Sequence, residues 1–84
     1  MIEVCEVEAY PDFNLCLHFN NGEKRTFDMK PYLQYPVFSR LGNKAFFLLA
    51  RVEYGTVTWP GEVDIAPETL YDRSVPLTIG DTYI

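Results

Sequence analysis

The sequence predicts a small α+β domain with a three-strand antiparallel meander, a short helical link, a C-terminal β-hairpin and one helical turn. Alternating apolar residues around an Asn-Gly turn predict the meander, and a change of period at Pro31 predicts the helical link. A second alternating pair around Tyr54-Gly55 predicts the hairpin. The 84 residues suffice for one domain, which we expect over residues 1–72, followed by a tail over residues 73–84.

The first two strands are expected over residues 2–9 and 13–19, where apolar and polar residues alternate. Pro11 suits the second position of a type I turn between them. A three-residue loop pairs Val7 with Leu15 and keeps one face of the hairpin apolar. A two-residue loop would place Leu15 opposite a glutamate, so the three-residue loop is preferred.

This register pairs Cys5 with Leu17 and places Cys16 on the opposite face of the hairpin, so a disulfide is not expected. Both cysteines are predicted to be buried or half-buried free thiols, as in a reducing compartment. His18 is the only histidine, and neither cysteine has the spacing of a metal ligand. The sequence therefore predicts no metal site and no cofactor.

The third strand is expected over residues 24–29, because residues 20–23 read Asn-Asn-Gly-Glu, a strong hairpin signal. We expect Phe27 to lie opposite Leu17, on the apolar face.

The helical link is expected to begin at Pro31 and to be stopped by Pro36. Residues 37–41 are expected to form another helical turn or an irregular apolar link, and residues 43–47 are expected to form a further helical turn that presents Phe46 or Phe47 to the core.

The C-terminal hairpin is expected to join residues 48–53 and 56–59. Pairing Glu53 with Thr56 leaves one apolar face and one polar face, which supports this register. Trp59, the only tryptophan, falls on the apolar face and is expected in the core.

The segment from residue 56 to residue 71 is expected to close the fold. It breaks at Pro60-Gly61, continues through a short apolar piece, and reaches Pro67, which is placed as the first residue of a helical turn. We expect Asp64 to accept backbone N–H hydrogen bonds where the chain enters that turn.

The net charge is -5, from 7 Lys and Arg against 12 Asp and Glu residues. An acidic protein is repelled by a phosphate backbone, so direct nucleic-acid binding is not expected. A small, basic protein partner would suit this charge better. No run of 18 apolar residues and no signal peptide is seen, which predicts a cytoplasmic protein without membrane association.

Four motifs are spaced along residues 3–71: LxLxF from Leu15, NGExRxFD from Asn21, FxxL from Phe38, and WxxxVDIxPxxLY from Trp59. In this order the chain resembles domain of unknown function 2442, a small prokaryotic family. The resemblance implies a cytoplasmic bacterial α+β domain without an assigned enzymatic activity. It also implies an association with toxin and antitoxin pairs, because some members look like stand-alone proteins encoded beside a toxin-like partner.

The leading hypothesis is a non-enzymatic protein-interaction module, the antitoxin-like or regulatory half of a two-protein system. The alternative is a small-molecule or metal-binding domain in the Trp59/Asp64 region. No catalytic residue is predicted, and self-association through a sheet edge stays open. The candidate partner-binding residues are Trp59, Glu62, Asp64, Glu68 and Tyr71.

Overall fold

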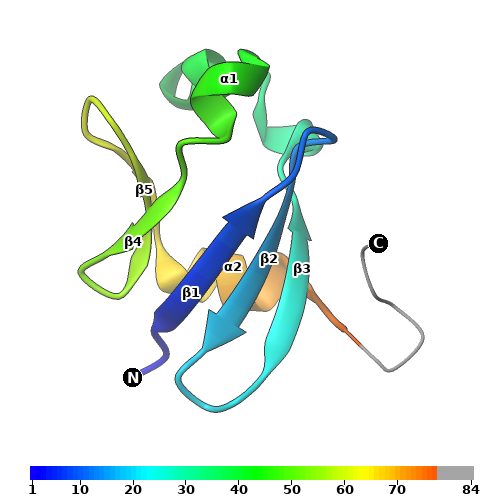
Figure 1. Ribbon diagram of the computed structural model, residues 1–84, viewed down its shortest axis with the longest axis vertical. Helices are drawn as coiled ribbons and strands as arrows, with labels where there is room; N and C mark the ends of the chain where they lie inside the picture. The colour runs from blue at the N-terminus through cyan, green and yellow to red at the C-terminus, as the bar shows by residue number, and fades with distance from the viewer. Residues whose placement is uncertain (78–84) are drawn as a thin grey trace.

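Two antiparallel sheets and four short helical segments make up the fold, which confirms the predicted α+β class (Figure 1). The computed structural model describes residues 1–77. In chain order the elements are β1 (Val4–Ala9), β2 (Asn14–Phe19), β3 (Lys24–Asp28), η1 (Lys30–Tyr32), η2 (Pro36–Gly42), α1 (Lys44–Phe47), β4 (Arg51–Glu53), β5 (Thr56–Trp59), β6 (Val63–Ile65), α2 (Pro67–Arg73) and β7 (Val75–Pro76).

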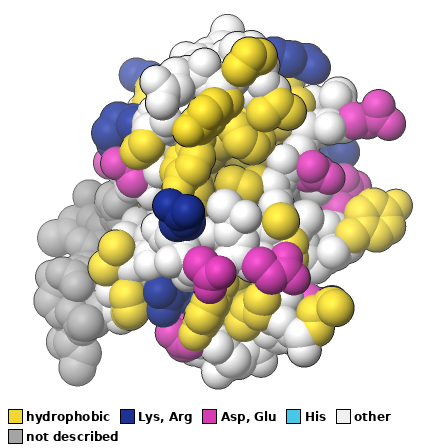
Figure 2. All heavy atoms as spheres, turned by 180° about the vertical axis from the view of Figure 1, so that it is seen from behind, with side chains coloured by type: hydrophobic (Ala, Val, Ile, Leu, Met, Phe, Trp, Pro, Cys, Tyr) yellow, Lys and Arg dark blue, Asp and Glu magenta, His cyan; other side chains and the backbone are white. Residues whose placement is uncertain are grey.

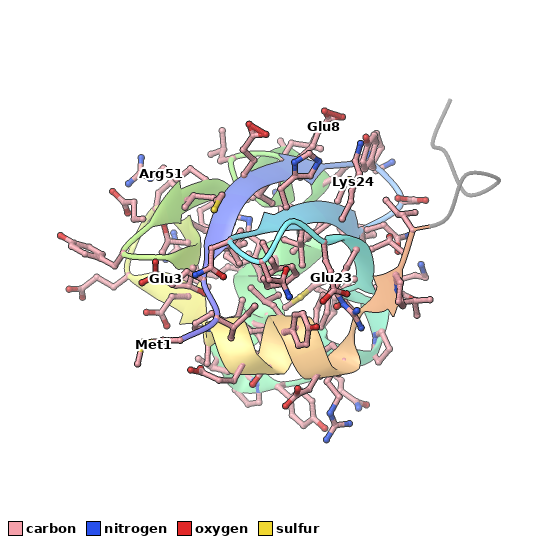
Figure 3. The ribbon with its side chains drawn as sticks, turned by 90° about the horizontal axis from the view of Figure 1, so that it is seen from below. Met1, Glu3, Glu8, Glu23, Lys24 and Arg51 are labelled. Atoms are coloured by element: carbon pink, nitrogen blue, oxygen red, sulfur yellow. The ribbon has the colours of Figure 1, made fainter. Side chains whose placement is uncertain are left out.

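The first sheet has the strand order β1-β2-β3-β7, and the second has the order β4-β5-β6. Helix α2 covers one face of the first sheet (Figures 1 and 3). The Val4 N–H donates to the Gly55 carbonyl at 2.8 Å, which ties the start of β1 to the β4–β5 turn. The core lies between the first sheet, α2 and the inner face of the second sheet, where Leu17, Leu70 and Val57 are fully buried.

The first hairpin differs from its expected register by two residues. Val7 pairs with Leu17, and Ala9 pairs with Leu15. The connection is longer than three residues because Phe13 adopts a left-handed conformation, with φ of 67°, before β2 begins. A shift of two residues leaves Val7, Ala9, Leu15 and Leu17 on their predicted face, so the apolar face of this part of the hairpin is confirmed although the pairing was wrong.

Cys5 does not face Leu17, which corrects a second detail of this hairpin. The register shifts between Val4 and Glu6, as in a β-bulge, so Val4 becomes 2% exposed and Cys5 lies in solvent. Both cysteines are free thiols, as predicted, but only Cys16 is buried.

Strand β3 also pairs two residues away from expectation, with Phe27 opposite Leu15 instead of Leu17. The shift is again an even number of residues, so Phe27 stays on the apolar face, where it is fully buried.

The helical link contains the expected turns. η1 and η2 each have a proline in the first turn, where the missing N–H costs nothing. The Asn43 side chain caps α1 by accepting from the Phe46 N–H at 3.1 Å, and Phe47 is the residue buried in the core.

The β4–β5 hairpin has the predicted register, with Val52 opposite Val57. Tyr54 and Gly55 both have positive φ, 54° and 74°, as the tight turns of two-residue hairpins require. The apolar piece after Gly61 is a third strand, β6, which the sequence analysis did not identify as a strand.

Trp59 is a core residue, as expected, with 1% of its surface exposed. Its indole N–H donates to the Phe47 carbonyl at 2.9 Å, which joins β5 to the end of α1. Asp64 does not cap α2. It is exposed on β6 opposite Thr58, and the N-cap of α2 is Ala66, without a side-chain hydrogen bond.

Part of the expected tail is ordered structure. Helix α2 continues to Arg73, and Val75 and Pro76 form β7 beside β3. The rest of the expected tail, residues 78–84, lies outside the described residues.

Candidate functional site

Three of the five candidate residues line one shallow depression on the second sheet, and the other two lie elsewhere on the fold. Trp59 lies in the core, and Glu68 is exposed on α2. Glu62 and Asp64 are exposed around the β5–β6 turn, where they border a shallow depression on the outer face of the second sheet. Tyr71 is half-buried and packs against the first sheet. The structure therefore brings Trp59, Glu62 and Asp64 together at one depression but places Glu68 and Tyr71 outside it.

The outer face of the second sheet carries a row of polar side chains across the strands. Arg51 pairs with Thr58, and Thr58 pairs with Asp64. The Thr58 hydroxyl donates to Glu53 Oε1 at 2.9 Å, and Arg51 Nε lies 3.5 Å from the same oxygen. The Glu53 carboxylate therefore already interacts with two neighbouring side chains, whereas Asp64 lies on β6, at the edge of the second sheet.

Tyr71 belongs to a polar cluster that joins α2 to the β2–β3 turn. Its hydroxyl donates to Glu23 Oε2, which also accepts from Asn21 Nδ2 at 2.7 Å. The Arg25 guanidinium donates to Glu23 Oε1 at 2.7 Å and lies 4.5 Å from the centre of the Tyr71 ring. Arg25 also donates to the Ser74 hydroxyl and carbonyl, at 2.6 and 2.9 Å. These residues hold the end of α2 and the start of β7 against the first sheet.

The electrostatics of this cluster follow from its hydrogen bonds. The Tyr71 hydroxyl, with Arg25 and Asn21, lowers the pKa of Glu23, because each donor favours the carboxylate. The same bond to Glu23 raises the pKa of Tyr71, because the phenol must keep its proton to donate. Figure 3 shows Glu23 between the sheet and α2, so its contacts serve the fold.

A groove of about 700 Å³ opens on the other side of the first sheet, between that sheet and β4. Glu8 and Lys24 project there, away from α2 (Figure 3). His18 Nδ1 lies 3.5 Å from Glu6 on the same face. Burial raises the pKa of the Cys16 thiol, so its reactive thiolate form is disfavoured.

A different surface holds four of the seven large hydrophobic side chains that are exposed among residues 1–77. Tyr35 is 49% exposed and Val37 is 65% exposed, while Leu48 and Leu49 are 42% and 53% exposed. We call the area formed by these four residues the helical apolar surface. Figure 2 shows hydrophobic side chains gathered in the upper half of the molecule, where Figure 1 places α1. Contiguous exposed apolar area of this kind is typical of an interaction site.

The sequence analysis missed this surface, although a signal was present. Residues 29–52 contain four Lys or Arg residues and no Asp or Glu, in a chain with a net charge of -5. Lys30 pairs with Asp28 and Arg51 pairs with Glu53, so Arg40 and Lys44 give η2 and α1 their positive charge on an otherwise acidic protein. The net charge of the whole chain conceals this difference.

Two kinds of feature were not found in the part of the chain that the structure describes. Residues 1–77 hold no group of three or more His, Cys, Asp or Glu side chains arranged to bind a metal ion. Over the same residues, no helix has the length and apolar character needed to cross a bilayer.

This geometry defines a class of protein. It is a two-sheet α+β domain with a covering C-terminal helix and an exposed apolar, cationic helical region. Within that class the chain belongs to the family described as protein of unknown function DUF2442, whose model matches residues 4–76. The match includes β7 as well as α2. No curated protein and no solved structure matches the chain.

Proposed function

We propose that this domain is a non-enzymatic protein-interaction module that binds a protein partner through the helical apolar surface. The observation that carries the proposal is the exposure of Tyr35, Val37, Leu48 and Leu49 within one stretch of the chain. Burial of aromatic and aliphatic side chains at an interface favours binding, because it removes apolar area from water.

The supporting structure is suited to presenting these side chains. The helical segments are held by the Trp59 hydrogen bond to the Phe47 carbonyl and by the Asn43 cap of α1. Leu41 and Phe47 anchor the segment because both are fully buried. A surface fixed in this way loses little conformational entropy when a partner binds.

The resemblance to a family associated with toxin and antitoxin pairs supports a more specific form of the proposal. The domain would be the antitoxin-like or regulatory half of a cytoplasmic two-protein system. A ligand-binding role for the Trp59/Asp64 region is the alternative. Trp59 could contribute little to such a site, because only 1% of its surface is exposed.

Affinity purification of the tagged chain from its native host tests the proposal. The unmodified chain is compared with a Val37→Ser/Leu49→Ser variant and with Tyr54→Asn, a control at a fully solvated turn position. Asn tolerates the positive φ of Tyr54, so the control should fold. Circular dichroism verifies the fold of each variant.

The expected result is a reproducible protein partner that is lost from the double variant and kept by the control. The partner, once identified, is purified and its affinity measured by calorimetry. A partner that binds all three chains equally would reject the helical apolar surface as the contact. Thermal-shift screening tests the alternative, since a ligand at 100 times its dissociation constant adds about 2.7 kcal/mol of stability.

A further inference from the structure

The helical apolar surface continues into a hollow that has a single charged group at its rim. The hollow is lined by Arg40, Asn43, Ala45, Phe46 and Leu49, has a volume of about 590 Å³ and is open to solvent. Most of its lining is apolar. A hollow of this kind accepts a hydrophobic side chain from a partner in the way that interface pockets accept anchor residues.

Arg40 is held in a defined position at this rim. Its guanidinium carbon lies 4.6 Å from the centre of the Phe46 ring. On its other side the guanidinium approaches the β5–β6 turn so closely that a Cβ atom added to Gly61 would lie 2.4 Å from Nη1. Stacking on an aromatic ring leaves the N–H groups at the edge of the guanidinium free to bind a planar acid.

No carboxylate among residues 1–77 forms an ion pair with Arg40. The helical segments around Arg40 carry charge of the same sign, because Lys44 begins α1 and residues 29–52 contain no Asp or Glu, whereas the β5–β6 turn on its other side carries the exposed Glu62 next to Gly61. The Arg40 side chain is therefore a positioned cation beside an apolar hollow, without an acidic partner among the described residues. Positive charge here complements a negative group on whatever occupies the hollow.

We propose that the hollow beside Arg40 binds a linear segment of an acidic protein partner, in which a hydrophobic anchor residue is adjacent to an Asp or Glu. The anchor packs against Phe46 and Leu49, and the carboxylate accepts two N–H donors from Arg40. This inference rests on the proposed function and specifies the chemistry of the partner. It differs from the basic partner expected from net charge, because the charge of this region is opposite to that of the whole chain.

Selection of random linear peptides displayed against the immobilised full chain tests the inference. Enriched peptides are expected to carry a large apolar residue next to Asp or Glu. A synthetic peptide with the enriched sequence should bind the unmodified chain and bind Arg40→Gln about tenfold more weakly, since a charge-assisted bidentate contact is lost. Binding should also weaken as ionic strength rises.

Arg73→Gln is the matched control, because it removes the same charge from an exposed position at the end of α2. It should leave peptide affinity unchanged, whereas Leu49→Ser should reduce it without affecting the fold. Equal losses in Arg40→Gln and Arg73→Gln would show a nonspecific charge effect and would overturn the inference.

Four other outcomes would also overturn it. These are enrichment of basic peptides, absence of enrichment, binding to phosphatidylglycerol vesicles that Leu49→Ser abolishes, and self-association through the hollow in sedimentation experiments. The proposed interaction module and the proposed acidic segment can be rejected independently of each other. A native partner that needs Val37 and Leu49 but has no acidic anchor segment would uphold the interaction module and reject the chemistry assigned to Arg40.

Discussion

Replacement of Trp59 by phenylalanine should destabilise the domain by about 2 kcal/mol. The substitution removes the indole N–H bond to the Phe47 carbonyl, which contributes about 1 kcal/mol. It also leaves a cavity of about 40 Å³, which costs about 1 kcal/mol at about 24 cal/mol per Å³. The Phe47 carbonyl still accepts the Ala50 N–H at 3.2 Å, so no further penalty for an unsatisfied acceptor is expected.

Urea unfolding followed by far-ultraviolet circular dichroism measures this effect, since the fluorescent residue is absent from the variant. The midpoint should fall with an unchanged slope, and the melting temperature should fall by about 8–16 °C in a domain of this size. Tyr54→Phe is the control, because Tyr54 is 99% exposed and its change should stay within about 0.5 kcal/mol. A Trp59→Phe loss below about 0.5 kcal/mol would refute the structural role assigned to the indole.

Four further outcomes follow from individual residues. Gly61→Ala should lower the urea midpoint, because φ is +85° there and a Cβ atom would meet a guanidinium; an unchanged midpoint would contradict this backbone geometry. The pKa of Glu23 is lowered in the folded state, so its stabilisation is fully present above the ordinary carboxyl pKa of 4.5 and is lost as pH falls through the folded pKa. Glu23→Gln should therefore flatten the acid limb of a stability–pH curve, and an unaltered limb would contradict this. Tyr71→Phe should flatten the alkaline limb, because a raised folded pKa gives stability that is lost at high pH, and retention of that limb would argue against the bond to Glu23. A maleimide should modify Cys5 quickly and Cys16 slowly in mass spectrometry, since only Cys5 is exposed, and equal rates would contradict the bulge in β1.

The second hairpin was predictable in detail because local chemistry determines it. Tyr54-Gly55 supplies the positive φ values of a two-residue turn, and the turn then fixes which residues pair. The first hairpin has no such constraint. The left-handed Phe13 lengthens its loop and the bulge at Cys5 shifts its register, and neither residue type signals that conformation.

The candidate site was harder to predict because contacts distant in sequence determine it. The side chain of Arg25 reaches Ser74, 49 residues away, and no local pattern predicts that pair. The apolar residues from Tyr35 to Leu49 lie in short helical turns without a regular period, so the sequence pattern could not separate buried from exposed positions. The local excess of Lys and Arg could have indicated the surface, had charge been counted by segment.

The position of β7 has a consequence for the newly made chain. β3 ends at Asp28, but the strand that completes its sheet begins at Val75. At about 5–20 residues per second, the ribosome leaves the edge of β3 unpaired for roughly 2–10 seconds. Lys24 and Arg25 lie along this edge, and their charges oppose pairing with a neighbouring chain during the interval. Until Ser74 is synthesised, the charge of Arg25 opposes pairing with a neighbouring chain. Once Ser74 is present, Arg25 makes its structural contact with that residue.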